Sequence, residues 1–422
     1  MSGKRKSQSI EESAKKPKLD AEICVKFMDT KNIPDVVWQN IFGFLSWKQI
    51  KFNVARVCRH FNEISNDCVQ VINIHENALF ASSHVLMFEA LSNFKFLKSI
   101  KIECNKGKKY AKSIDFFLMH ALKNCPRLRF IETSHELSTD FLNHIAKHGE
   151  KLYGLYLYFG NTNTQEILSP LKKGMKNLKC LGLFCLERSN FKDGDLLSLL
   201  ENCKELNSIN IQDCEIAVDT MFELINLKKD KLKHLNFGQI NIGDGWLQEL
   251  GNCPNFEWLT IASMDITDSG FEAISKLKNL KTLQFGYSHD QRKEFKTDDL
   301  IKMMANGKFE NLKQLYVFGI HDSIGELLLS AAFACPNLRH LICECMIDSR
   351  KSFPKNIIQI LLDNLPELMR LNIEWILHHS DTNSTENPIF VKSEVDTIVG
   401  KCKNKFEVVI EDDTQIDIMR AM

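Results

Sequence analysis

The sequence has no excess of charge of either sign and no long apolar run. Lys and Arg together number 54, as do Asp and Glu, so the formal net charge at pH 7 is zero. A neutral chain has no global attraction to nucleic acid or to an anionic membrane surface. A membrane-spanning helix needs about 20 consecutive apolar residues, and no such run is present. The sequence therefore predicts neither a nucleic-acid nor a membrane partner.

The N-terminus lacks the apolar segment of a secretory signal. This absence predicts an intracellular protein, located in the nucleus and/or the cytoplasm. The 14 cysteines are then expected to be reduced thiols.

Catalytic and metal-binding motifs are also missing. The sequence contains no phosphate loop, nucleophile elbow or dinucleotide fingerprint. The cysteine pairs with the shortest spacings, Cys343 with Cys345 and Cys180 with Cys185, do not match the paired spacings of a zinc site. His144 and His148 share a helix face without the adjacent Glu of a zinc protease. We therefore predict a protein that is not an enzyme, with no catalytic residue, no metal and no cofactor.

Residues 33–67 contain apolar side chains at helical spacing. Pro34 suits a first helical position, where its missing N–H costs nothing. The helical pattern is made by Val37, Ile41 and Leu45, followed by Ile50, Val54, Val57, Phe61 and Ile64. Two or three helices of this size cannot cover all of this apolar surface, so part of it is expected to meet a partner or the next domain.

This segment resembles the F-box. The resemblance is carried by Ile33-Pro34, by Ile41-Phe42-Gly43-Phe44-Leu45 and by Val57-Cys58-Arg59-His60-Phe61, with Phe61 in place of the usual closing Trp. It implies docking on the Skp-type adaptor of a cullin-based ubiquitin ligase. The implied adaptor-binding residues are Ile33, Pro34, Val37, Ile41, Phe42, Leu45, Val54, Val57 and Cys58. Some of them must also fold the box, and the sequence does not separate the two roles. The alternative is an ordinary helical cap on the next domain.

A frame of the form Leu-x-x-Leu-x-Leu recurs through the rest of the chain, at intervals of about 26 residues. Each frame is followed by a segment with helical periodicity, such as residues 266–277. The frames begin at Leu97, Leu128, Leu152, Leu178, Leu206, Leu232, Phe256, Leu280, Leu312, Leu338 and Leu368.

The repeats resemble the cysteine-containing leucine-rich repeats that often follow an F-box. Cys125, Cys203, Cys253 and Cys335 occupy one recurring context and are expected to be small buried apolar residues. We predict an α/β leucine-rich-repeat solenoid, a horseshoe, with an N-terminal all-α F-box module. The expected parts are a disordered basic tail over 1–29, the F-box over 30–68, the solenoid with its C-terminal cap over 69–412, and an exposed tail over 413–422. Within the cap, 390–402 is expected to be a helix and 406–410 a strand.

Strand alternation predicts which residues line the concave face. The leucines of each frame turn inward, so the third and fifth positions and the one after the last Leu face solvent. The aromatic residues in these positions are Phe130, Tyr156, Tyr158, Phe184, Trp258, Tyr316 and Phe318. Polar side chains lie between them: Ser208, Asn210, Gln212, His234, Asn236, Thr260, Thr282, Gln284 and Gln314.

This composition predicts a protein partner for the concave face. Aromatic residues with amide neighbours are typical of protein interfaces, and a nucleic-acid groove would need a basic stripe. The cations of the face are Lys101 and Arg370, near the two ends. The alternative is that the C-terminal tail or residues 287–296 cover the rings. If the face is not the recognition site, the loops at 105–113 and 287–296 are the next candidates.

The first 20 residues hold two basic clusters with a polar spacer. The clusters, Lys4-Arg5-Lys6 and Lys15-Lys16-Pro17-Lys18, resemble a bipartite nuclear-import signal, and the alternative is a solubilising tail.

Together, the two resemblances imply the substrate receptor of a Skp–cullin–F-box ubiquitin ligase, which binds the adaptor with one part and a target protein with the other. The competing hypothesis is a leucine-rich-repeat scaffold or inhibitor without a ubiquitin-ligase role.

Overall fold

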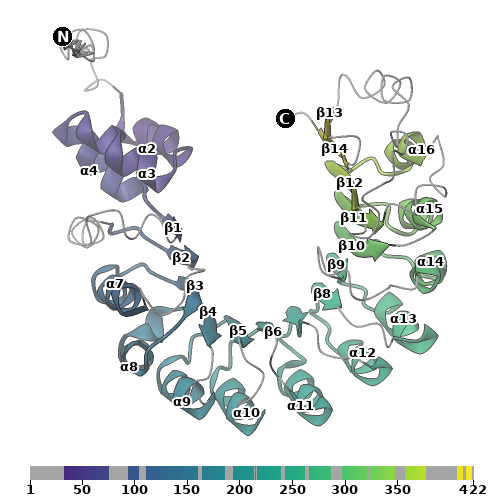
Figure 1. The fold of residues 1–422 in the computed structure, drawn as a ribbon, viewed down its shortest axis with the longest axis horizontal. Coiled ribbons are helices and arrows are strands. Elements are labelled where there is room, and N and C mark those ends of the chain that lie inside the picture. The colour runs from purple at the N-terminus through teal and green to yellow at the C-terminus, as the bar shows by residue number, and fades with distance from the viewer. Residues whose placement is uncertain are drawn as a thin grey trace, which may run out of the picture. The chain divides into compact units, whose positions relative to one another are not determined.

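The computed structural model consists of two compact units, residues 1–70 and 71–422 (Figure 1). It describes residues 33–75, 94–103, 111–159, 164–185, 193–212, 214, 216–238, 243–261, 266–286, 297–320, 323–346, 357–376, 406–411 and 415–420. The expected tail over 1–29, the loop residues 105–110 and 287–296 and the expected helix over 390–402 lie outside these ranges. No helix among the described residues is both long enough and apolar enough to cross a membrane.

The first unit is helical, as the sequence predicts. Its elements are α2 (Asp35–Gly43), α3 (Trp47–Phe52), η2 (Val54–Arg56) and α4 (Arg59–Cys68). Pro34 caps α2 instead of beginning it, and its carbonyl accepts the Val37 N–H at 2.9 Å. Ser46 and Gln49 form a capping box at the start of α3. Local capping therefore explains where these short helices begin.

Three aromatic rings form the core of this unit. Trp38 and Phe42 on α2 meet Phe61 on α4, with ring centroids 4.7 Å (Trp38–Phe61) and 5.3 Å (Phe42–Phe61) apart. The buried side chains of Ile50 and Ile64 complete the core. Phe61, at the position where the F-box pattern usually has Trp, is thus a core residue.

The second unit repeats a strand and a helix, with the strands on its inner side and the helices on its outer side (Figure 1). The strands are β1 (Val71–His75), β2 (Ser99–Glu103), β3 (Phe130–Glu136), β4 (Gly154–Phe159), β5 (Cys180–Cys185), β6 (Ser208–Gln212), β7 (His234–Asn236), β8 (Trp258–Ile261), β9 (Thr282–Phe285), β10 (Gln314–Ile320), β11 (His340–Met346), β12 (Arg370–Ile376), β13 (Phe406–Glu411) and β14 (Gln415–Arg420). The helices are α7 (Ala111–Asn124), α8 (Thr139–His148), η4 (Gly149–Lys151), α9 (Thr164–Gly174), α10 (Asp193–Asn202), α11 (Val218–Lys228), α12 (Asp244–Leu250), α13 (Asp268–Ser275), α14 (Thr297–Asn306), α15 (Ile324–Ala334) and α16 (Ile357–Asn364).

The strands form one sheet in which β1 to β12 are parallel neighbours in chain order. The frame leucines fill the interior between this sheet and the helices; Leu181, Leu183, Leu235, Leu259 and Leu283, for example, are at most 1% exposed. The predicted leucine-rich-repeat solenoid with an N-terminal helical module is therefore confirmed.

The loops that lead from each helix into the next strand are joined across repeats. The carbonyl of Lys179 accepts the N–H groups of both Asn207 and Ser208, at 3.0 Å each, and equivalent paired bonds run from β2 to β12. Asparagine side chains add a second ladder, as when Asn279 Nδ2 donates to the Pro254 carbonyl at 2.6 Å and Asn311 Nδ2 to the Lys278 carbonyl at 2.8 Å. These bonds fix the register of the strands and thus of the side chains on the concave face.

The recurring cysteines have the role that the sequence predicts. Cys125, Cys203, Cys253 and Cys335 are buried free thiols. Burial raises the pKa of Cys203 to about 11 and that of Cys335 to about 12, so both thiols stay protonated and behave as small apolar side chains.

The expected exposed tail over 413–422 is wrong for residues 415–420. These residues form β14, which pairs antiparallel with β12 on one side and with β13 on the other. The run 415–420 alternates polar and apolar residues except at Met419, a weak form of the strand pattern. The hairpin pairs the backbone of β12, which would otherwise be an open sheet edge.

Candidate protein-binding surfaces

The helical unit exposes an apolar surface that its own core does not use. Phe44 is 91% exposed and Val57 is 68% exposed. We call this surface the box patch and define it by the exposed apolar residues Val36, Val37, Ile41, Phe44, Phe52 and Val57. Four of them, Val36, Val37, Ile41 and Phe44, lie on one side of a helical projection, and large apolar side chains gathered in this way mark a site of interaction with a protein partner.

The structure separates the folding residues of the expected adaptor site from the exposed ones. Pro34, Val37, Ile41, Val57 and Cys58 are exposed, whereas Ile33, Leu45 and Val54 are half-buried. Phe42 is 3% exposed and packs on Trp38 and Phe61, so it is one of the residues that fold the box.

The sequence pattern did not single out Val36, Phe44 and Phe52 as surface residues. Val36 and the C-cap residue Phe44 share the outward side of α2 with Val37 and Ile41, whereas Trp38 and Phe42 share the buried side. A helical projection of residues 35–44 separates these two sides, because successive residues turn by about 100°.

The expected aromatic residues of the concave face fall into separate groups. On β3 to β5, the ring of Phe130 lies 5.3 Å from that of Tyr156, and Tyr158 stacks on Phe184 at 4.3 Å. On β10, Tyr316 and Phe318 lie 6.5 Å apart in a stacked arrangement. Trp258 is separate from both groups and is 41% exposed. All seven residues are half-buried or exposed, but their rings do not form one continuous ladder.

Two glycines create space for the first group, and the sequence analysis missed their role. A Cβ at Gly182 would lie 2.2 Å from Cδ1 of Tyr156, and a Cβ at Gly154 would lie 2.1 Å from Cδ2 of Phe130. Each ring thus lies over the glycine of the next strand, with which its own residue is in register. The sequence signal for this role is a glycine in an outward-facing position of one frame and an aromatic residue in the matching position of the frame before it.

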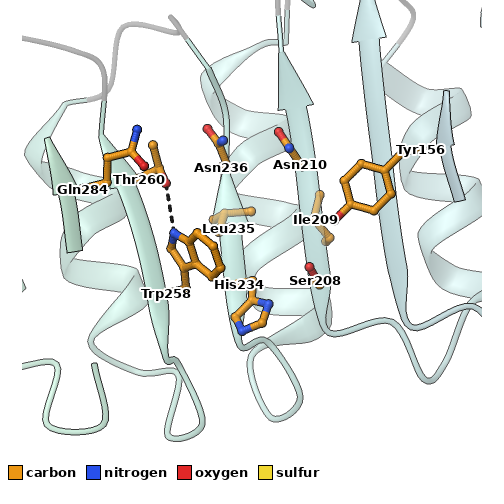
Figure 2. Close-up of a pocket in the computed structure, with 10 residues that line it drawn as sticks. All are labelled: Tyr156, Ser208, Ile209, Asn210, His234, Leu235, Asn236, Trp258, Thr260 and Gln284. Atoms are coloured by element: carbon orange, nitrogen blue, oxygen red, sulfur yellow. Dashed lines mark hydrogen bonds between the residues drawn. The ribbon is translucent and has the colours of Figure 1, made fainter. Parts of the chain in front are cut away.

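Between the aromatic groups the face forms a hollow of about 140 Å³ (Figure 2). Tyr156 and Trp258 stand on opposite sides of it (Figure 2). Trp258 Nε1 donates to Thr260 Oγ1 at 3.3 Å, and the His234 ring lies edge-on to the indole at 5.5 Å. We call this site the central hollow; its lining residues are Tyr156, Ser208, Ile209, Asn210, His234, Leu235, Asn236, Trp258, Thr260 and Gln284.

The lining side chains come from two rows that run across the strands. Ser208, His234 and Trp258 are register partners on β6, β7 and β8. Asn210, Asn236, Thr260 and Gln284 are register partners on β6 to β9, so they recur at the strand spacing of about 4.8 Å.

Local hydrogen bonds hold the amides in position. Gln212 Nε2 donates to Asn210 Oδ1 at 3.1 Å, and Asn236 Oδ1 accepts the Gly238 N–H at 2.9 Å. Gln284 Nε2 donates to the Gly286 carbonyl at 3.1 Å. The row is therefore oriented before any ligand arrives, which lowers the entropy lost on binding.

Ionic groups on the concave face and beside the central hollow are paired with one another. Lys101 forms ion pairs with Glu132 at 2.9 Å and with Glu103 at 3.4 Å, and the hydrogen bond to Glu132 is the main cause that raises the pKa of Lys101. At the hollow itself, burial lowers the pKa of His234 and raises that of Tyr156, so both side chains are neutral near pH 7.

Further cations lie where the helix-to-strand loops enter the sheet. Lys233 and Lys281 both pair with Glu257, at 3.3 and 3.0 Å, and the Tyr153 ring contacts Lys179 and Arg129. Each of these four cations therefore has a partner within the chain.

The described residues contain no group of three or more His, Cys, Asp or Glu side chains placed to hold a metal. The His144 and His148 rings lie 4.5 Å apart on α8. Burial, followed by the charge of His148, lowers the pKa of His144. Two imidazoles supply fewer than the three protein ligands of a catalytic zinc site.

Two curated proteins match part of the sequence. F-box/LRR-repeat protein 21 of Bos taurus is 31% identical over 81 residues, and its counterpart in Ovis aries is 30% identical over 81 residues. Each match covers 19% of this chain and spans only 18% of the relative's own length. No protein-family model matches the chain.

A solved structure matches far more of the fold. The crystal structure of the yeast Rad7 and Elc1 complex contains a chain that aligns with a TM-score of 0.50 and 17% identity, covering 88% of this chain and 94% of that one. At this identity the match shows the fold alone. The sequence matches and this fold together confirm the predicted resemblance to F-box and leucine-rich-repeat proteins.

Proposed function

We propose that this chain, which resembles F-box/LRR-repeat proteins in sequence and fold, is the substrate-recognition subunit of a Skp–cullin–F-box ubiquitin ligase. The observation that carries the proposal is the box patch, because an F-box-like sequence exposes Val37, Ile41, Phe44 and Val57 where its own core does not need them. The patch binds the Skp-type adaptor and, through it, the cullin. The solenoid binds the target protein.

The proposed mechanism is proximity, without a catalytic group in this chain. Binding to the adaptor and to a target at once raises the effective concentration of the target near the ligase core, and effective concentrations from such tethering are in the millimolar range. Ubiquitin transfer itself is carried out by the partners, and the ubiquitinated target is then degraded by the proteasome. No cofactor is required of this chain.

Affinity purification with the proteasome blocked tests the proposal directly. Tagged chain is purified from cells and its partners are identified by mass spectrometry. A Skp-type adaptor and a cullin among the partners are the expected result. A set of bound proteins without adaptor or cullin would instead favour the leucine-rich-repeat scaffold or inhibitor.

Trp258→Ala and Tyr316→Ala are each expected to weaken target binding by about 2 kcal/mol, or about 30-fold, while adaptor binding is unchanged. Aromatic residues that are partly exposed before binding and buried after it contribute most of the energy of protein interfaces. The measurement is the quantity of each co-purified protein relative to adaptor. Tyr153→Ala is the matched control, because Tyr153 is 45% exposed but lies outside the concave positions. If all variants co-purify the same amount of each target protein, the target-binding site lies elsewhere.

We also propose that Lys4, Arg5, Lys6, Lys15, Lys16 and Lys18 direct nuclear import. Replacing Lys15, Lys16 and Lys18 by Ala is expected to shift a fluorescent fusion from nucleus to cytoplasm, because import receptors recognise the clustered positive charge. The control replaces Lys172, Lys173 and Lys176, which are exposed in and just after α9. An unchanged nuclear fraction in the first variant would leave the segment as a solubilising tail.

A further inference from the structure

The volume of the central hollow limits what it can hold. A cavity of about 150 Å³ takes one benzene molecule, and the hollow measures about 140 Å³. It is therefore large enough for one aromatic side chain and too small for a folded element. The Trp258 indole, at 41% exposed, offers a ring surface to such a guest.

The charge of the lining excludes ionic guests. No Lys, Arg, Asp or Glu is among the residues that line the hollow, and its titratable groups, His234 and Tyr156, are neutral near pH 7. Lys233 and Lys281 act on His234 from beside the hollow, but both are already paired with Glu257. A carboxylate or phosphate group placed here would lose hydration without gaining an unpaired cation, which costs roughly several kcal/mol. Lys101, a cation of the same face, is paired with Glu132 and Glu103.

The amide row supplies the remaining chemistry. Asn210, Asn236 and Gln284 each carry both a donor and an acceptor, which are the two groups that a peptide bond presents. With Thr260 they form one row of register partners across β6 to β9. A bound polypeptide that lies across the sheet therefore meets one polar side chain per strand. This arrangement suits an extended polypeptide rather than a small apolar molecule.

We infer that the central hollow binds one uncharged aromatic side chain of an extended, unmodified segment of the target, with the amide row engaging the main chain of that segment. The inference rests on the proposed function in that the concave face is the target-binding face. Target recognition by this chain then needs no phosphorylation of the segment that enters the hollow.

Synthetic peptides that share polar, neutral flanks and differ in one central residue test the inference. The central residue is Phe, Tyr, Trp, Gln, Glu or phosphotyrosine, and binding to the full chain is measured by fluorescence anisotropy. The aromatic peptides are expected to bind at least about tenfold more tightly than the Glu and phosphotyrosine peptides, because only the latter bring an uncompensated charge. Equal or tighter binding of the phosphotyrosine or Glu peptide overturns the inference.

Variants of the chain show whether the hollow itself is responsible. Ser208→Leu fills the hollow and Trp258→Ala removes its ring surface, so both are expected to abolish the preference for aromatic peptides. Gln314→Leu alters a register-equivalent position on β10, outside the lining, and is expected to keep the preference. A preference that persists in both Ser208→Leu and Trp258→Ala overturns the inference.

Two further readouts separate the possible failures. A peptide that matches residues 287–296 of this chain is included, and its preferential binding would assign the hollow to the chain itself and overturn the inference. Adaptor binding is measured on the same samples. Loss of adaptor binding with an intact aromatic preference contradicts the ligase role alone, whereas adaptor binding without the preference contradicts only the inference about the hollow.

Discussion

Replacing Ile41 by Glu is expected to abolish binding to a Skp-type adaptor while the chain stays folded. Ile41 is 46% exposed in the box patch, so the carboxylate is hydrated in the free chain. Docking would bury this charge against an apolar partner surface, which costs about 3 kcal/mol or more, a loss of over about a hundredfold in affinity. Pull-down of purified adaptor and cullin by the full chain measures the effect.

Gln39→Glu is the control for this experiment. Gln39 is exposed on the same helix, two residues before Ile41, and the change adds a carboxylate of the same kind. Because Gln39 is not part of the box patch, its variant is expected to bind adaptor as the unchanged chain does. Adaptor binding that survives Ile41→Glu would remove the box patch from the docking surface, and with it the main support for the ligase role.

Phe42→Ala is expected to unfold the helical unit, although Phe42 is adjacent to Ile41. The Phe42 ring is 3% exposed and packs against both Trp38 and Phe61. Truncating a buried Phe to Ala costs about 3–5 kcal/mol, which is a large share of the stability of so small a unit. Hydrogen exchange of the full chain is expected to show lost protection over residues 35–68 and unchanged protection in the strands from β2 to β12.

Phe44→Ala removes the same atoms from an exposed position, and so separates folding from binding. Phe44 is 91% exposed, so its truncation is expected to change the free energy of unfolding by less than about 0.5 kcal/mol. It is expected to weaken adaptor binding without loss of exchange protection. If residues 35–68 show the same exchange protection in the Phe42→Ala and Phe44→Ala variants, the assignment of Phe42 to the core and Phe44 to the box patch is wrong.

Features that depend on spacing along the chain could be predicted from the sequence. The Leu-x-x-Leu-x-Leu frames predicted the parallel strands, and strand alternation predicted that Trp258, Tyr156 and His234 face outward, because side-chain direction in a strand follows residue order. The terminal β14 was missed because a run of six residues with weak alternation, after an acidic stretch of sequence, resembles an exposed tail. Its pairing with β12 joins residues far apart in sequence.

Contacts between repeats and between helices could not be predicted in this way. Whether Gly182 leaves room for an aromatic ring depends on the direction of the Tyr156 ring, one repeat earlier. The two residues become neighbours only after the strands pair. Likewise, Ile41 and Phe42 are adjacent apolar residues in one motif, and only the packing of α2 on α4 turns one ring inward and leaves the other side chain exposed.

The sequence by itself determined the repeat, the helical N-terminal module and the side chains of the concave face, since periodicity sets which way each residue points. Only the tertiary structure decided which of these side chains meet. The central hollow lies where Tyr156, His234 and Trp258 come together from β4, β7 and β8, with the register held by backbone bonds between repeats. Distances between strands are set by packing and hydrogen bonding across the sheet, and a linear pattern contains no information on the empty space that such packing leaves.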